Sequence, residues 1–358
     1  MQSQLTKANK PPELSYAASL NIINRCYIDV RSPSEYAADH IPGAFNLPLF
    51  DDEQRAKIGA IYHNISQNQA RLSGLELAIP RLPWLLGELR QIHLTGYCPI
   101  LYCWRGGLRS QAVQEAATLQ GLPCLRLAGG YKEYRHWVLD ILDKPLPFPV
   151  ITLHGLTGCG KTAILRLLRE KHDLQVLDLE GLAQHRGSVF GHIGLAGQPT
   201  QKYFQSLLAY ELFKFSSTKP LLLECESRRV GCLLLHDNLY SAIKNGLRIL
   251  VYDSPRGRAY RLLMEYAPAQ NLDQIIEALN SPALKAKFSA TRLYQLAQQI
   301  QAGTYEEVIE YLLIHYYDPL YYYPGAPTQD YSLTVNSVDI AKAAKEIERI
   351  VKDIECQK

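Results

Sequence analysis

Short apolar runs alternate along this chain with longer stretches whose apolar residues recur at helical spacing. Apolar runs bounded by turn residues are typical of buried strands, while a repeat of three to four residues is typical of helices. In the first part of the chain this pattern predicts strands at residues 26–30, within 41–48, at 98–103 and at 124–130. It predicts helices at 32–40, over most of 51–95, at 110–122 and at 131–142. Ser32 and Pro33 favour the start of the first of these helices.

The same alternation continues in the second part of the chain. Strands are expected at residues 150–155, 174–183, 220–227 and 247–254, with a helix at 163–171. From Arg256 onward the chain is expected to be largely helical, and it is rich in tyrosine. Strands that alternate with helices predict an α/β protein, in which helices cover both faces of a parallel sheet.

A proline-rich break, DKPLPFP at residues 143–149, divides the two parts. With 358 residues the chain is long enough for two domains of ordinary size. We therefore expect an N-terminal tail at 1–14, one domain at 15–142, the linker at 143–149 and a second domain at 150–358, whose last part is helical. A net charge of +3 neither requires nor excludes a nucleic-acid partner, since a basic face can lie within a balanced total.

The cysteines and the apolar segments predict a cytoplasmic location. The eight cysteines are scattered without a CxxC pair, which favours free thiols in a reducing compartment and argues against a zinc site. The first residues contain no apolar leader, and no segment approaches the roughly 20 apolar residues of a membrane span. We expect no membrane association.

The stretch LYCWRGGLRS, residues 101–110, predicts a reactive cysteine in an anion-binding loop. Cys103 ends an apolar strand and a helix follows, so its thiol lies where ligands bind to parallel sheets. Backbone N–H groups of the loop and the N-terminus of the helix favour a thiolate and a bound anion. The predicted members of this loop are Cys103 as nucleophile, with Trp104, Arg105, Gly106, Gly107 and Arg109 around the anion.

Together with YIDVRSPSEYAADHIPGAFNLP, this loop resembles the rhodanese domain of sulfurtransferases over about residues 15–140. Five residues separate Cys103 from Arg109, a longer spacing than in common single-domain rhodaneses. The longer form also occurs in rhodanese-fold phosphatases, and it suits a phosphate-sized anion. Those phosphatases usually have histidine before the cysteine, where this chain has Tyr102. A persulfide or perselenide carrier and a phosphatase both stay open.

The stretch GLTGCGKT, residues 155–162, matches the P-loop pattern between a predicted strand and a predicted helix. Its amides are expected to wrap a di- or triphosphate, with Lys161 on the terminal phosphate and Thr162 available for a metal ion. The predicted diphosphate-binding residues are Gly155, Gly158, Gly160, Lys161 and Thr162. The later strand offers Glu224 and Glu226, but it has no aspartate where a nucleotide-hydrolysing P-loop protein would place one. ATP hydrolysis is therefore not predicted.

A rhodanese domain upstream of this P-loop resembles the tRNA 2-selenouridine synthase family over almost the whole chain. Further marks are LDLEGLAQHRGSVFG (177–191), GQPTQKYF, ECESRRVG (224–231) and YYDPLYYYP (316–324). On these motifs the resemblance implies candidate substrate or tRNA contacts at Glu180, His185, Arg186, Glu224, Glu226, Ser227, Arg228 and Asp318. Arg229, Arg256, Arg258 and the tyrosines of the last motif are further candidates, because arginines and aromatic rings are the usual contacts to RNA.

The resemblance also implies the reaction. Wobble 2-thiouridine of tRNA would be alkylated with geranyl diphosphate, and selenium from selenophosphate would then replace the S-geranyl group. The implied partners are tRNA, through its anticodon region, and a selenophosphate synthase that supplies the donor. No tightly bound cofactor and no metal ligand are assigned, and a magnesium requirement stays open, as does the oligomeric state. The alternative is a rhodanese-fold phosphatase or sulfurtransferase fused to an ATP-binding, kinase-like domain.

Overall fold

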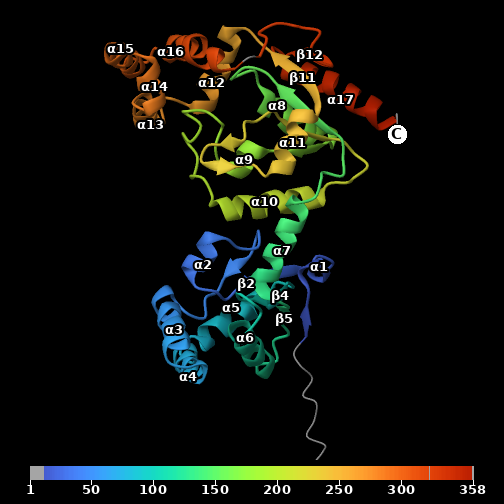
Figure 1. The fold of residues 1–358 in the computed structure, drawn as a ribbon, viewed down its shortest axis with the longest axis vertical. Helices are drawn as coiled ribbons and strands as arrows, with labels where there is room; N and C mark the ends of the chain where they lie inside the picture. Colours follow the sequence, from blue (N-terminus) through green and yellow to red (C-terminus); the bar gives the residue numbers. More distant parts are fainter. Residues whose placement is uncertain (1–11, 322, 357–358) are drawn as a thin grey trace, which may run out of the picture. The chain divides into compact units, whose positions relative to one another are not determined.

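The computed structural model describes residues 12–321 and 323–356, and the chain forms two compact units (Figure 1). One unit extends to Ile141 and includes Gln205–Tyr210, and the other holds Leu142–Phe204 and the chain from Glu211 onward. Each unit contains a parallel sheet with helices, which confirms the predicted α/β class. The exact ends of the predicted domains stay a prediction, and residues 1–11 of the expected tail lie outside the described residues.

The sheet of the first unit is parallel throughout, with strand order β1-β5-β4-β2-β3. Its strands are β1 (Glu13–Leu14), β2 (Arg25–Asp29), β3 (Phe45–Asn46), β4 (Cys98–Tyr102) and β5 (Leu125–Leu127). The register pairs Asp29 with Tyr102, so β2 and β4 end side by side. Glu13 and Leu14, which the sequence assigned to the tail, pair with β5 at the edge of this sheet.

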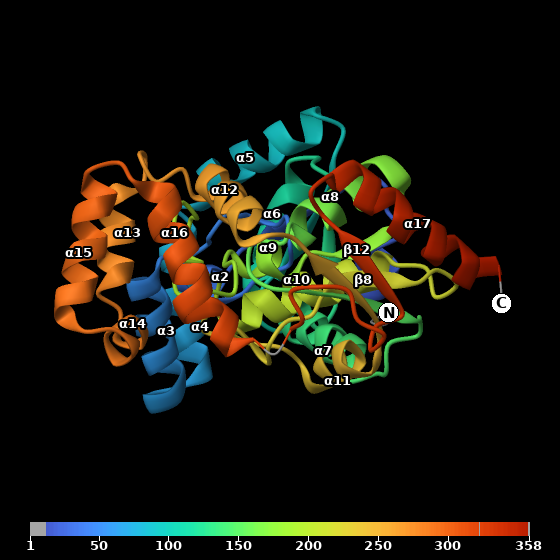
Figure 2. The ribbon, with the colours of Figure 1, turned by 90° about the horizontal axis from the view of Figure 1, so that it is seen from above.

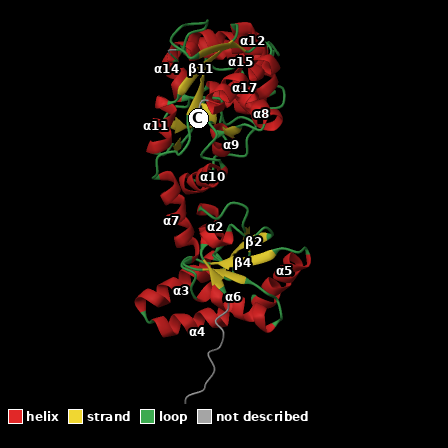
Figure 3. Cartoon of the chain, turned by 90° about the vertical axis from the view of Figure 1, so that its right-hand side faces the viewer, coloured by secondary structure: helices red, strands yellow, loops and turns green. Residues whose placement is uncertain are grey.

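Helices flank this sheet, and α5 and α6 pack against β4 and against each other (Figure 3). The helices are α1 (Tyr16–Ser19), α2 (Pro33–Ala38), α3 (Asp52–Asn64), α4 (Gln67–Ala78), α5 (Leu82–Leu94), α6 (Leu108–Leu119) and α7 (Gly130–Leu142). As predicted, Ser32 is the N-cap of α2, with Pro33 in its first position. The core joins Ile28 and Leu101 of the strands to Leu85, Leu89 and Val113 of α5 and α6.

The sheet of the second unit is also parallel, with strand order β12-β11-β6-β8-β7. Its strands are β6 (Val150–His154), β7 (Gln175–Leu177), β8 (Leu221–Glu224), β11 (Leu247–Tyr252) and β12 (Leu333–Asn336). A separate antiparallel pair is formed by β9 (Arg229–Val230) and β10 (Leu233–Leu234). The central position of β6 places the end of this strand, and the P-loop after it, in the middle of the sheet.

Two groups of helices complete the second unit. Beside the sheet lie α8 (Lys161–His172), α9 (Leu179–Ala183), α11 (Asp237–Asn245), α12 (Pro255–Tyr266) and α17 (Ile340–Cys356). The helix α10 (Gln201–Lys214) is divided, because its residues Gln205–Tyr210 belong to the first unit. A helical group follows α12: α13 (Leu272–Leu279), α14 (Pro282–Lys287), α15 (Ala290–Gln301), α16 (Tyr305–Leu312), the π-helix η1 (Leu313–Tyr317) and the 3-10 helix η2 (Asp318–Leu320). Figure 2 shows α13 to α16 gathered together and α17 beside α8.

The second unit corrects the sequence prediction at two places. Residues 174–183 were expected to form one strand, but the strand ends at Leu177 and α9 follows. The reason is Asp178, whose carboxylate accepts a hydrogen bond from the Gly181 amide (2.8 Å) and so caps the new helix. The strand β12 was not predicted, since the chain beyond Arg256 was expected to be largely helical.

None of the helices found in residues 12–321 and 323–356 has both the length and the apolar composition of a bilayer-spanning segment.

Candidate functional site

Cys103 directly follows β4, and α6 begins five residues later at Leu108. Its side chain is 3% exposed. The sulfur lies 3.3 Å from Ser110 Oγ and 3.7 Å from the carbonyl oxygen of Gly107. Ser110 was not among the predicted site residues, although it ends the same motif. The first turn of α6 therefore surrounds the thiol, as expected for an anion-binding loop at the end of a parallel strand.

The loop after Cys103 packs directly against the start of α7. The amide of Tyr131 donates to the Cys103 carbonyl (2.8 Å) and that of Lys132 donates to the Trp104 carbonyl (2.9 Å). Gly130 has a φ of +59°, and a Cβ added there would lie 2.2 Å from the Cys103 carbonyl oxygen. Only glycine fits such a position, because neither the backbone angle nor the space admits a side chain. This contact fixes the shape of the loop.

The two predicted loop arginines lie in different surroundings. Arg105 is exposed, whereas Arg109 is half-buried and donates to both carboxylate oxygens of Glu35 (2.6 and 3.3 Å). Burial opposes the negative charge of Glu35, but the hydrogen bonds and charge of Arg109 outweigh it and lower the pKa of this carboxyl. Trp104 is exposed, and its ring lies 5.1 Å from that of Tyr131. Anion binding by Arg105 and Arg109 stays a prediction.

A buried polar network beside this loop was not predicted as part of the site. Arg31 is 1% exposed and pairs with Asp29 through several hydrogen bonds of 2.6–3.0 Å. Its guanidinium lies 4.0 Å from the ring centre of Tyr131, whose hydroxyl donates to Asp39 (2.6 Å). The sequence offered one indication of this network, because Asp29 and Arg31 lie on either side of the end of a predicted strand.

In the second unit, residues 155–160 form a loop between β6 and α8, as the P-loop pattern predicts. Gly155, Gly158 and Gly160 all have positive φ. A Cβ on Gly155 would lie 2.1 Å from the Val251 carbonyl oxygen, so the loop can cross β11 only with glycine there. Lys161 donates to the carbonyls of Gly155 (3.0 Å) and Leu156 (3.4 Å).

Three carboxylates gather beside Lys161 and Thr162. Glu224 ends β8, Glu226 follows it, and Glu180 comes from α9. One oxygen from each lies within 4.8 Å of the others. The hydroxyl of Thr162 donates to Glu224 (2.6 Å) and contacts Glu180 (3.4 Å). The structure thus brings together four predicted residues from three distant parts of the sequence. Their oxygen atoms are of the type that binds Mg²⁺.

Burial changes the charge of this cluster. Burial and the neighbouring carboxylates raise the pKa of Glu180 to about 10 and that of Glu226 to about 7. Burial also raises the pKa of Glu224, against the attraction of Lys161. For Lys161 burial opposes the charged amine, but Glu224 and the other acids outweigh it and raise the pKa. The cluster therefore combines one firmly held positive charge with carboxylates that share protons, or a cation, at neutral pH.

Two arginines, one buried and one half-buried, hold the P-loop from the other side. Arg258, 1% exposed, donates to the Thr157 carbonyl (3.2 Å) and forms a two-fold hydrogen-bonded pair with Asp318 (2.6 and 2.8 Å). Arg261 donates to the Gly158 carbonyl (2.6 Å) and pairs with Asp253 (2.9 Å). Arg258 and Asp318, considered above as tRNA or substrate contacts, thus support the loop from within. Sequence reasoning missed Arg261 and Asp253, which no motif marks.

The remaining candidates lie around these elements. His185 accepts a hydrogen bond from the Gly187 amide (3.1 Å), and Arg186 pairs with Glu265 (2.8 Å) beside the Tyr266 ring. Arg228 is exposed and pairs with Asp237, whereas Ser227 bonds to the backbone of Arg229. Of the tyrosines in the last motif, Tyr316 and Tyr317 are buried, Tyr321 and Tyr323 are half-buried, and Tyr322 lies outside the described residues.

Comparison with known proteins connects both loops. Residues 16–136 match the family model of the rhodanese-like domain, and residues 148–301 match that of the tRNA 2-selenouridine synthase AAA domain. A tRNA 2-selenouridine synthase of Shewanella pealeana is 33% identical over 352 residues, which cover 88% of this chain and 92% of that protein. The chain belongs to the tRNA 2-selenouridine synthase family. A member from Pseudomonas syringae is 32% identical over 332 residues, covering 83% of this chain and 87% of that protein.

In this member of the tRNA 2-selenouridine synthase family, each of the two matched regions contains one of the two predicted anion-binding loops. Cys103 and its loop lie in the rhodanese-like region, while the P-loop and the three carboxylates lie in the AAA region. Asp318 and the π-helix lie beyond residue 301, outside both family models. The resemblance predicted from the motifs is confirmed.

Proposed function

We propose that this chain converts wobble 2-thiouridine of tRNA to 2-selenouridine through an S-geranyl intermediate. The observation that carries the proposal is that one member of this family has both a buried thiol in an anion loop and a P-loop with a half-buried lysine. Each loop suits one of the two anionic donors, selenophosphate and geranyl diphosphate. The substrate common to both reactions is a single tRNA base.

In the first step the sulfur of 2-thiouridine attacks the allylic carbon of geranyl diphosphate. The C–S bond forms, the C–O bond breaks, diphosphate leaves and the base loses its N3 proton. Lys161 and the amides of the P-loop would stabilise the negative charge that develops on the leaving diphosphate. Their positions are fixed by Arg258 and Arg261, which hold the loop carbonyls. This preorganisation suits departure of a diphosphate and needs no attacking water.

In the second step selenium from selenophosphate replaces the S-geranyl group at C2 of the base. Alkylation has turned the sulfur into a thiol leaving group, so selenium can add at C2 and geranyl thiol can leave, while phosphate is released from the donor. We propose that the Cys103 thiolate attacks the phosphorus of selenophosphate: an S–P bond forms, the P–Se bond breaks, and the released selenide adds at C2, after which water hydrolyses the S-phosphocysteine to phosphate. The proposal is supported by the first turn of α6 around its sulfur and by the exposed Arg105 beside it.

A magnesium ion would fit beside the P-loop. Thr162, Glu180, Glu224 and Glu226 supply hard oxygen atoms, and their spacing allows a shared cation. When bound, such an ion would neutralise part of the diphosphate charge. The role of these residues would then be to hold the ion while Lys161 holds the diphosphate.

The macromolecular substrate would be the anticodon region of tRNA, which arginines and aromatic rings recognise. Exposed Arg228, Arg229 and Arg256 are the available candidates. A selenophosphate synthase would supply the selenium donor. Because tRNA is the substrate, we propose a cytoplasmic location.

The proposal is tested by incubating the purified chain with thiolated tRNA, geranyl diphosphate and selenophosphate, and analysing the nucleosides by mass spectrometry. Geranylated thiouridine is expected when selenophosphate is left out, and selenouridine when both donors are present. If neither nucleoside forms, the proposal is wrong. Hydrolysis of a phosphate ester or of ATP in their place would favour the phosphatase or kinase-like alternative.

Single substitutions separate the two steps. Lys161→Ala should reduce geranylation by about a hundredfold or more, because it removes a preorganised charge from the leaving group. Cys103→Ser should leave geranylation intact and block selenation. Lys171→Ala, an exposed lysine on the same helix, and Cys232→Ser, an exposed cysteine, are the matched controls and should behave like wild type. Loss of the same step in both site variants would contradict this division of labour.

A further inference from the structure

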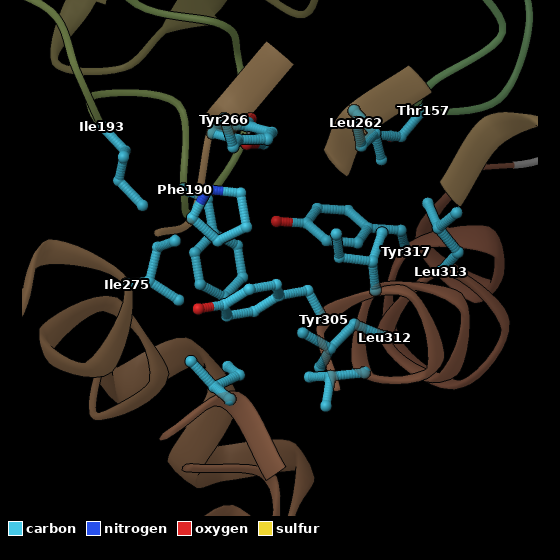
Figure 4. Close-up of a pocket in the computed structure, with 15 residues that line it drawn as sticks. Thr157, Phe190, Ile193, Leu262, Tyr266, Ile275, Tyr305, Leu312, Leu313 and Tyr317 are labelled. Carbon is cyan, nitrogen blue, oxygen red and sulfur yellow. The ribbon is translucent and has the colours of Figure 1, made fainter. Parts of the chain in front are cut away.

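An apolar pocket lies among the helices that follow the sheet of the second unit (Figure 4). Its walls come from α12, α13, α15, α16 and η1, together with the segment that carries Phe190 and Ile193. The cavity measures about 60 Å³. By the same measure a single buried water needs about 10–15 Å³. The pocket therefore has room for a chain of several carbon atoms.

The wall of this pocket is almost wholly hydrocarbon. Ile275, Leu312 and Leu313 are buried aliphatic side chains on it, and the rings of Phe190 and Tyr305 face its centre (Figure 4). Two of its few polar groups satisfy each other, since the hydroxyls of Tyr266 and Ser188 lie 3.3 Å apart. Cavities with such walls exclude water and bind apolar groups.

The irregular helix η1 shapes one side of the pocket. A π-helix contains an extra residue in its turn, and such segments often mark functional sites. Leu313 and Tyr317, its first and last residues, both line the pocket, and both are buried. Residues four apart lie on one side of a helical segment, so η1 presents both side chains to the cavity.

The pocket meets the P-loop at Thr157. This residue belongs to the loop and also lines the cavity. Its carbonyl accepts from Arg258, which pairs with Asp318, the residue after Tyr317. A group held by the amides of the P-loop would thus have an apolar cavity directly beside it.

We propose that this pocket binds the hydrocarbon chain of the prenyl diphosphate whose diphosphate is held by the P-loop. This inference rests on the proposed function and adds the element that recognises the chain. An amphipathic donor of this kind needs an anion loop and a dry apolar pocket in contact, and Thr157 provides that contact. The aromatic walls also suit an allylic carbon that becomes positive as diphosphate leaves, because ring faces attract cations.

The same geometry predicts which residue limits the length of the chain. In Figure 4 Thr157 and Ile275 lie on opposite sides of the pocket. Ile275 comes from α13 and is buried. A chain that enters beside Thr157 would end against this side chain. Ile275 is therefore the specificity-determining residue in our proposal.

Equilibrium binding to the full chain tests the pocket without any turnover. Geranyl diphosphate should bind at least about tenfold more tightly than inorganic diphosphate, because its chain leaves water. Ile275→Phe should abolish most of this difference and leave the affinity for inorganic diphosphate unchanged. Equal affinities of the wild-type chain for the two probes would overturn the proposal.

Alkylation of thiolated tRNA with dimethylallyl, geranyl and farnesyl diphosphate tests the length limit. Ile275→Ala should raise kcat/KM for farnesyl relative to geranyl diphosphate by about tenfold or more, as expected for a pocket that gains this much space. Ile275→Phe should shift the preference toward the dimethylallyl donor. Ile243→Ala removes the same side chain from a buried position of α11 outside the pocket, and it should leave the preference unchanged.

The outcomes distinguish this inference from the proposed function. If the wild-type chain alkylates tRNA with none of the three donors, the proposed function is wrong. If it alkylates tRNA but both Ile275 variants keep the wild-type preference, only the pocket assignment is wrong. Thermal unfolding of each variant shows whether it is folded, and Ile275→Val supplies a milder truncation that should shift the preference in the same direction as Ile275→Ala.

Discussion

Glu35 accepts hydrogen bonds from both terminal guanidinium nitrogens of Arg109, one of the two arginines after Cys103. Arg55 lies near the same carboxylate, at 3.6 Å. The pair joins the start of α2 to the start of α6, across residues that are far apart in the sequence. Glu35 therefore acts as a positioning residue: it holds the guanidinium of Arg109 in one orientation beside the loop.

Removal of this carboxylate should destabilise the chain in a pH-dependent way. We expect Glu35→Gln to lower the free energy of unfolding by about 2 kcal/mol at pH 7, the usual contribution of charged hydrogen bonds. The pKa of Glu35 is lowered in the folded state from its usual value near 4.5. Its stabilisation is therefore fully present above that value and is lost as the pH falls through the folded pKa.

Urea unfolding of both proteins at pH 7 and at successively lower pH measures this effect. The difference between wild type and Glu35→Gln should shrink below about pH 4.5. Glu88→Gln on α5, an exposed position, is the control and should change little. A difference that stays constant down to acid pH would mean that the carboxylate charge plays no part.

At the scale of elements, the start of α7 fixes the backbone conformation of the Cys103 loop through direct backbone contacts. Gly130→Ala should destabilise the chain by about 3 kcal/mol or more, since it combines a left-handed backbone with a backbone clash. Chemical denaturation measures the loss, and selenation should fall with it because the loop is distorted. Gly87→Ala on α5, where a Cβ meets nothing within 4 Å, should instead stabilise by about 0.5–1 kcal/mol. If Gly130→Ala unfolds at the same denaturant concentration as wild type, the start of α7 does not fix the conformation of the loop.

The elements also explain what could be predicted from the sequence. Cys103, Lys161 and Thr162 stand in contiguous motifs between a strand and a helix, so their local structure follows from local sequence. The pairing of Glu35 with Arg109 depends on strand order, which no local pattern contains. The same holds for the approach of Glu180 to Glu224, because α9 comes after β7, and β7 lies next to β8 in the sheet.

Two features of the second unit, the strand β12 and the apolar pocket, could not be predicted from the sequence for other physical reasons. β12 is only four residues long, Leu333–Asn336, and its partner β11 ends at Tyr252, far earlier in the chain. The residues of β12 alternate between apolar and polar, but a run of four is too short to distinguish a strand from a loop by periodicity. The pocket is likewise invisible in the sequence, because its apolar residues have the spacing of ordinary core helices.

At the scale of the whole molecule, each unit has a hydrophobic core of its own. One core surrounds β4 in the first unit, whereas the second unit has one core around β6 and another among α12 to α16. A ligand of the P-loop should therefore stabilise the second unit directly, with about 2.7 kcal/mol at a concentration a hundred times its Kd. Because the first unit has a separate core, we expect no change in its stability when the ligand binds.

Hydrogen exchange of the full chain tests this prediction. With inorganic diphosphate and magnesium, protection should rise in β6 and α8 (residues 150–172) and stay unchanged in β4 and α6 (residues 98–119). Lys161→Ala should abolish the rise, while Lys171→Ala should preserve it. A rise of equal size in both regions would mean that the two units respond as one.

The late position of β12 in the chain has a consequence for how the protein is made. All strands of the first sheet precede residue 128, so the surroundings of Cys103 can assemble early in translation. The second sheet gains its edge only with residues 333–336, and α17, which packs on α8, follows still later. A fragment cut at residue 301, where the family match ends, would leave β11 as an open edge that invites aggregation. The phosphate-binding unit is thus completed only when the ribosome has translated β12 and α17.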